Sequence, residues 1–76
     1  MNENKTDLAA PVYYKERQIV LTPNAQEDGT WVCRYSIIER GESSLKSVKG
    51  HVDGTFPSRE AAELAAVQQA KSMIDL

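Results

Sequence analysis

The sequence predicts an α+β domain with the element order β-β-β-α, in which a three-stranded antiparallel sheet packs one face against a single C-terminal helix. Three short segments of alternating apolar residues come first, and one long Ala-rich segment without Gly or Pro follows them. A chain of 76 residues is long enough for only one domain. We expect residues 1–11 to form a flexible N-terminal tail and residues 12–76 to form the domain.

The helix is predicted to run from Glu60 to Met73, because this segment holds good helix formers and no helix breaker. Ser58 precedes it and is suited to accept a hydrogen bond from a free N–H group of the first turn. Leu64 points away from the expected sheet, either as an ordinary exposed side chain or as part of a second packing surface. One helix face collects mostly small side chains, which allow close approach to a sheet: Ala62, Ala66, Ala70 and Met73, with Ala65 and Ile74 at its edges.

Two strands are predicted over residues 17–22, ending before Pro23, and over residues 30–39. The pair Asp28-Gly29 lies between them and indicates a hairpin turn, because Gly tolerates positive φ. Successive side chains of a strand point to opposite faces, so the apolar alternation predicts which residues face the helix. That set is Ile19, Leu21, Trp31, Cys33, Tyr35 and Ile37.

A third strand is predicted over residues 44–52, with Gly41 in the turn before it. Gly50 interrupts it and marks either a β-bulge or a place where another group approaches the backbone closely. Phe56 is expected to close one end of the core. The strand face opposite the helix is expected to carry Leu45, Ser47, Lys49 and His51.

A single helix can cover only one face of the predicted sheet, so the other face is where a ligand, a nucleic acid or a second subunit would bind. Apolar side chains on such a face favour burial against protein, whereas basic side chains favour phosphate contacts. The competing interpretation is a solvated polar face without a partner. The candidate binding face consists of Val32, Arg34, Ser36, Ile38, Lys46, Lys49 and His51, with Arg40 and Lys46 near its rim.

The composition argues against several classes of protein. The formal net charge is −2, and residues 30–59 are only mildly basic, whereas strong nucleic-acid binders carry a larger positive excess. No apolar run approaches the length of a transmembrane helix, so we expect no membrane partner. Cys33 is the only cysteine, which excludes an internal disulfide framework and predicts a cytoplasmic location.

Residue patterns typical of catalysis are scarce, and we expect neither an enzyme nor a bound cofactor or metal. Cys33 and His51 are the only residues of their types, but Cys33 lies in phase with the apolar positions of its strand, which predicts a buried thiol. The chain has too few soft ligands for a structural zinc site. No nucleophile-elbow or phosphate-loop pattern is present.

Two stretches of the chain resemble a known DNA-binding family. Residues 29–35 (Gly-Thr-Trp-Val-Cys-Arg-Tyr) and 54–62 (Gly-Thr-Phe-Pro-Ser-Arg-Glu-Ala-Ala) are similar to the AP2/integrase N-terminal type of domain. The resemblance implies a three-stranded antiparallel sheet on a C-terminal helix, with DNA read from the sheet face, where Arg34 falls in the strand phase used by the family. The family's first-strand arginines and its third-strand Arg and Trp have no counterpart here.

A second resemblance, to HicB-type antitoxins, rests on residues 28–31 (Asp-Gly-Thr-Trp) and on the helix opening at residues 58–62. These antitoxins also have a strand, an acidic-Gly turn and a second strand, but their Pro-Asp-Leu-Pro-Gly segment is missing here. Small bacterial proteins of unknown function share the same layout. Shared β-β-β-α architecture alone explains both likenesses equally well.

The sequence therefore predicts a small non-enzymatic binding module that uses the uncovered sheet face for protein–protein binding or self-association. Val32 and Ile38 favour a protein partner or a homo-oligomer. Arg34, Lys46 and Lys49 favour the alternative, a DNA-binding module that reads DNA with the same face. A further alternative is an antitoxin-like regulatory protein.

Overall fold

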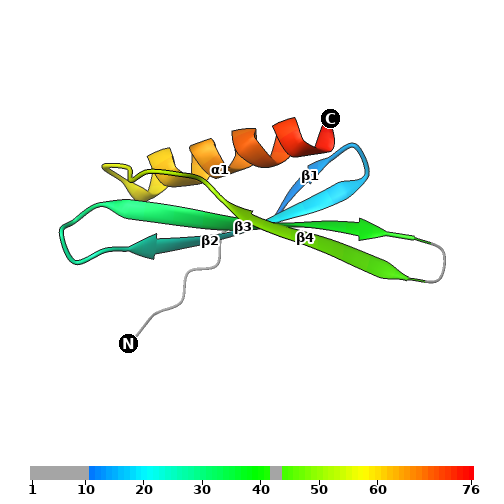
Figure 1. Cartoon of the computed structure of the whole chain (residues 1–76), viewed down its shortest axis with the longest axis horizontal. Coiled ribbons are helices and arrows are strands. Elements are labelled where there is room, and N and C mark those ends of the chain that lie inside the picture. Colours follow the sequence, from blue (N-terminus) through cyan, green and yellow to red (C-terminus); the bar gives the residue numbers. More distant parts are fainter. Residues whose placement is uncertain (1–10, 42–43) are drawn as a thin grey trace.

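The computed structural model describes residues 11–41 and 44–76 and shows an antiparallel sheet with one helix on one face (Figure 1). The four strands lie in the sheet in sequence order, β1-β2-β3-β4, and α1 packs on β2 and β3. The predicted α+β class is confirmed, but the sheet has four strands and not three. The bounds are Val12–Tyr14 for β1, Arg17–Ala25 for β2, Trp31–Arg40 for β3, Leu45–His51 for β4 and Arg59–Ile74 for α1.

The strand that the sequence did not predict is β1, which pairs with the start of β2. Tyr14 and Arg17 are paired at the end of this hairpin, and the two residues between them, Lys15 and Glu16, have φ angles of 50° and 64°. Two-residue turns with positive φ normally use Gly, Asn or Asp. The sequence therefore carries no signal for this hairpin. Residues 1–10, which make up most of the predicted tail, lie outside the described residues.

The second strand is longer than predicted, because β2 continues through Pro23 to Ala25. Pro23 lies opposite Cys33, whose carbonyl accepts a hydrogen bond from Val52 on the other side of β3. Hydrogen-bonding directions alternate along an antiparallel ladder, so the nitrogen of Pro23 points away from β3. None of the described residues pairs with β2 on that side at this point, so the missing N–H group of Pro23 breaks no ladder bond among residues 11–41 and 44–76.

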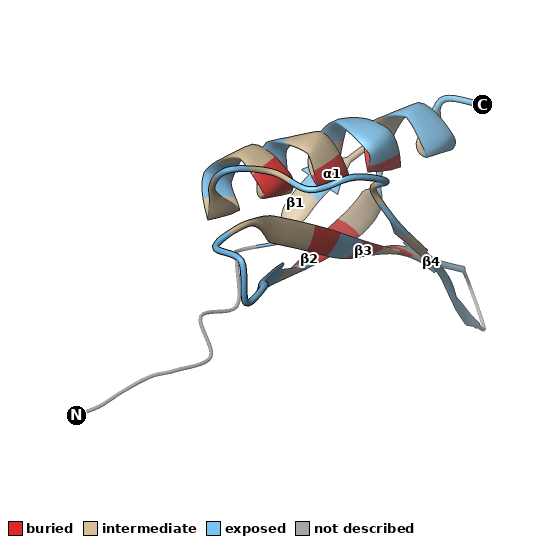
Figure 2. Ribbon diagram, turned by 60° about the vertical axis from the view of Figure 1, so that its left-hand side comes forward, coloured by how far each residue is buried: buried red, intermediate tan, exposed pale blue. Residues whose placement is uncertain are grey.

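The predicted alternation of the strands is confirmed by burial. Among the buried residues are Ile19 and Leu21 of β2 and Cys33, Tyr35 and Ile37 of β3, all of which pack with the helix in one core. Trp31 and Phe56 are half-buried and join by a pair of backbone hydrogen bonds of 2.8 and 2.9 Å, which tie the segment before α1 to β3. The whole core thus lies between the sheet and the helix (Figure 2).

Helix α1 begins as predicted, with the Ser58 hydroxyl accepting a hydrogen bond of 3.1 Å from the Ala61 N–H group. Three alanines, Ala62, Ala66 and Ala70, are completely buried against the sheet. Met73 was predicted on the same stripe but is 41% exposed, because the four-residue spacing of the alanines continues to Ile74 instead. No helix within residues 11–41 and 44–76 is long and apolar enough to cross a membrane.

The β1–β2 turn contacts the C-terminal end of α1. Asp75 accepts hydrogen bonds of 2.6 Å from Lys15 Nζ and 3.0 Å from Tyr14 Oη, and so links the β1–β2 turn to the end of the helix. The hydrogen bond from Lys15, followed by that from Tyr14, holds the pKa of Asp75 below its usual range. This cluster is exposed, so its effect on stability is small.

An Asp75→Asn variant is expected to be less stable than the natural chain at neutral pH and equally stable in strong acid. A carboxyl whose pKa is lowered by folding contributes stability above its unfolded pKa and loses that contribution as the pH falls through its folded pKa. Urea unfolding of both chains across the acid range tests this. A difference in urea midpoint that stays constant down to strong acid would show that the carboxylate charge has no role.

Candidate functional site

The sheet surface opposite α1, here called the outer face, is covered by no element of the described chain (Figure 2). The strand registers place Val32, Arg34, Ser36 and Ile38 of β3 on this face, as the sequence predicts. The last residue of β3 and the neighbouring strands contribute the rest of the surface. These further outer-face positions are Tyr13, Gln18, Val20, Thr22, Asn24, Arg40, Leu45, Ser47, Lys49 and His51.

Charge is distributed unequally between the two faces of the sheet. The basic side chains on the outer face of the described strands are Arg34, Arg40, Lys49 and His51, and no Asp or Glu lies among them. Glu39, the one acidic residue within the strands, points to the helix side and pairs with Arg17 at 2.8 Å. The strands therefore supply no carboxylate to the outer face, and the nearby acidic groups come from turns: Asp53 lies 3.7 Å from His51, and Glu27 and Asp28 border a depression with Arg34.

Three of the four basic residues of the outer face, Arg34, Lys49 and His51, lie near one another at the C-terminal end of β4, whereas Arg40 lies at the other end of the β3–β4 pair. Arg34 lies directly opposite His51, and Lys49 lies opposite Ser36, so the side chains are neighbours across the ladder. They border a depression of about 380 Å³ together with Thr22 of β2. Hydroxyl and basic groups around one depression are suited to bind a carboxylate or a phosphate oxygen.

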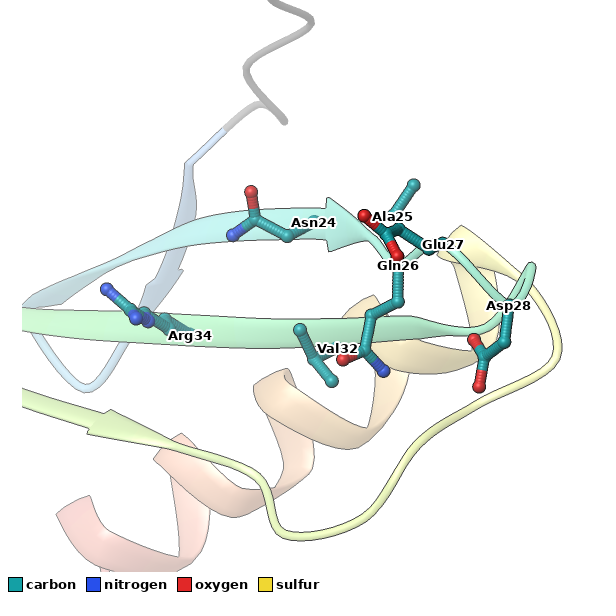
Figure 3. Close-up of a pocket in the computed structure, with 7 residues that line it drawn as sticks. All are labelled: Asn24, Ala25, Gln26, Glu27, Asp28, Val32 and Arg34. Atoms are coloured by element: carbon teal, nitrogen blue, oxygen red, sulfur yellow. The ribbon is translucent and has the colours of Figure 1, made fainter.

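A second, more open depression of about 800 Å³ lies at the β2–β3 hairpin and is shown in Figure 3. Arg34 and Val32 of β3 and Asn24 of β2 form its floor, and the turn residues Glu27 and Asp28 close its end. The Asp28 carboxylate accepts hydrogen bonds from the hydroxyl and the backbone N–H of Thr30, which lower its pKa. Arg34 is the residue shared by both depressions.

Apolar side chains lie among the basic ones on the outer face. Val20, Val32 and Ile38 are half-buried there, while Tyr13 and Leu45 are 72% and 64% exposed. Tyr13 is not among the predicted site residues, because its position follows from β1, for which the sequence has no turn signal. Isolated exposed apolar residues are ordinary, but several on one uncovered sheet face are typical of a surface that binds another molecule.

One predicted site residue is on the wrong face. Lys46 lies opposite Glu39 on the helix side of the sheet, where it borders a depression with Val48 and Met73. The strict alternation of β4 separates it from Lys49 and His51, which lie on the outer face. The remaining predicted site residues are together on the outer face, as expected.

Cys33 and His51 do not form a pair. Cys33 is 1% exposed beneath the helix, and burial raises the pKa of its thiol, which disfavours the thiolate. His51 is exposed on the opposite face, with its Nδ1 atom 3.7 Å from the Asp53 carboxylate. Within residues 11–41 and 44–76 no three His, Cys, Asp or Glu side chains are grouped so that they could hold a metal ion.

Comparisons of this chain with protein-family models, with curated proteins and with solved structures found no match.

Proposed function

We propose that this chain is a small non-enzymatic binding module and that its outer face binds a protein with an acidic surface. The proposal rests on the composition of the outer face. Its strands present Arg34, Arg40, Lys49 and His51 beside exposed or half-buried apolar residues, and they present no carboxylate there. Interfaces between proteins typically have apolar centres with polar and charged surroundings.

The charge of the outer face argues against a second copy of the same face as its partner. In a two-fold symmetric contact each patch meets itself, so Arg34 and Lys49 would approach cations of the second copy. Like charges brought together at an interface cost several kcal/mol. A partner with Asp and Glu side chains would instead neutralise these cations, while Val32 and Ile38 would contact its apolar groups.

Binding of nucleic acid is the second candidate function, favoured by the same absence of outer-face carboxylates. Arg34, Lys49 and His51 would contact phosphates, and the resemblance to AP2-type domains implies such a role for Arg34 alone. The overall charge of −2 and the apolar residues of the face favour a protein instead. Nuclease treatment of the lysate before affinity capture distinguishes the two.

The test is affinity capture from a lysate of the source organism with three immobilised chains. One is the natural chain, one carries Arg34→Gln and Lys49→Gln, and one carries Gln68→Glu and Gln69→Glu on the exposed surface of α1. Each double variant lowers the net charge by two, so the variants differ only in where the charge changes. We expect the outer-face variant to retain the partner at least about tenfold less than the other two chains.

Two other outcomes are informative. If the outer-face and helix variants lose the partner equally, or neither does, the outer face is not the binding surface and the proposal fails. If nuclease treatment of the lysate abolishes capture by the natural chain, the partner is a nucleic acid and the second candidate replaces the first.

A further inference from the structure

The long edge of the sheet is formed by β4, which has no neighbour on one side among the described residues. α1 packs on β2 and β3, and both Figure 1 and Figure 2 show β4 extending beside and beyond it. Six of its seven residues are exposed, the exception being Gly50. A long exposed edge strand is a surface on which another strand can pair.

The direction of the free backbone groups on β4 follows from one hydrogen bond. The Val52 N–H group donates a hydrogen bond of 3.3 Å to the Cys33 carbonyl, so the backbone polar groups of Val52 point toward β3. Bonding directions alternate along an antiparallel ladder, and Val48 and Gly50 therefore also point toward β3. The N–H and C=O groups that point away from the sheet are those of Leu45, Ser47, Lys49 and His51.

We propose that β4 pairs antiparallel with β4 of a second copy of this chain, about a two-fold axis at Val48. The surface is distinct from the outer face, so this proposal does not depend on the proposed function. In this register Leu45 lies opposite the partner's His51, and Ser47 lies opposite the partner's Lys49. The backbone groups of the four residues that point outward then form hydrogen bonds with the partner strand, and all seven residues of β4 lie opposite a residue of that strand.

The same register separates the charges of the two strands. Lys49 faces a serine and Lys46 faces a glycine, so no two cations are directly opposite. Moving the axis to Lys49 would place two lysines face to face, and moving it to Ser47 would leave His51 beyond the end of the partner strand. The charge pattern of β4 therefore favours the axis at Val48.

Apolar side chains support this position of the axis. Val48 is 53% exposed on the helix side and borders a depression of about 220 Å³ with Met73 and Ile74 at the end of α1. At the axis the two Val48 side chains form a non-hydrogen-bonded pair, in which side chains are closest. The pairing would cover Val48 and produce one eight-stranded sheet whose two outer faces lie on the same side.

The test compares sedimentation of the natural chain with that of Val48→Lys and Leu64→Lys. Both substitutions add one cation at an exposed apolar residue, since Leu64 is 59% exposed, but only Val48→Lys places two cations at the axis. We expect a dimer for the natural chain and for Leu64→Lys, and a folded monomer for Val48→Lys. A natural chain that is monomeric up to millimolar concentration, or a Val48→Lys variant that remains dimeric, would overturn the proposal.

Cross-linking provides a second readout that does not depend on loss of binding. Val48→Cys is expected to form a disulfide between two copies under mild oxidation. Lys46→Cys is not, because residue 46 lies opposite residue 50 of the second copy, four positions away from residue 46 of that copy. The natural Cys33 is buried and provides a background without cross-linking. Equal cross-linking at both positions, or at neither, would contradict the axis at Val48.

Discussion

Ile19→Ala is expected to unfold much of this protein at temperatures where the natural chain is folded. Ile19 of β2 is fully buried in the core beneath α1, and truncation of such a side chain costs about 2–5 kcal/mol. A domain of this size has a total stability on the order of 5 kcal/mol. We expect thermal unfolding, followed by circular dichroism, to show a midpoint lowered by about 10 °C or more.

Ile38→Ala is the matched control, because it removes the same atoms from the other face of the sheet. Ile38 is only half-buried on the outer face, and its truncation is expected to cost about 1 kcal/mol or less. Equal losses for the two variants would mean that the outer face is buried as deeply as the core, which would contradict a sheet covered on one side only.

Gly50→Ala is expected to destabilise the chain by about 1–3 kcal/mol, although Ala is the smallest possible addition. The ring of Tyr35, which is 5% exposed, lies across Gly50 on the neighbouring strand. A β-carbon at Gly50 would be 2.5 Å from the hydroxyl oxygen of Tyr35 and 2.6 Å from the ring carbon that bears it. The ring or the edge strand must therefore move.

A double-mutant cycle with Tyr35→Leu isolates this contact. Removal of the ring leaves space for the new methyl group, so Gly50→Ala should be nearly neutral or slightly stabilising in the Tyr35→Leu background. Urea unfolding of the four chains gives the coupling energy, expected to be about 1 kcal/mol or more. Additive effects of the two substitutions would show that the ring does not restrict Gly50.

Most of the correct predictions from the sequence rest on the alternation of side chains along the strands. Trp31, Cys33, Tyr35 and Ile37 alternate with smaller or polar residues, which identifies the two faces of β3 without any knowledge of the other strands. The helix could also be predicted from the sequence, because the N-cap role of Ser58 and the four-residue spacing of the buried alanines are local features. The same alternation predicted that Val32, Arg34, Ser36 and Ile38 lie on the outer face.

Features that depend on distant contacts were the ones missed. The hairpin at Lys15 and Glu16 uses positive φ angles that neither residue favours, so only the completed sheet and its contacts account for it. Pro23 is tolerated in β2 because its nitrogen points away from β3 and the described part of β1 does not extend beside it, which no local pattern reveals. For Gly50, the sequence left a bulge or a close approach open, and the unbroken register with Tyr35 above it shows the close approach.

NMR titration with the captured partner shows whether that partner binds the outer face. We expect the amide signals of Arg34, Ser36 and Lys49 to shift, while those of the buried helix residues Ala62 and Ala66 remain in place. Random-sequence duplex DNA at low salt, added in a parallel titration, should leave the spectrum unchanged. Shifts centred on α1, with unchanged β3 and β4 signals, would contradict the account.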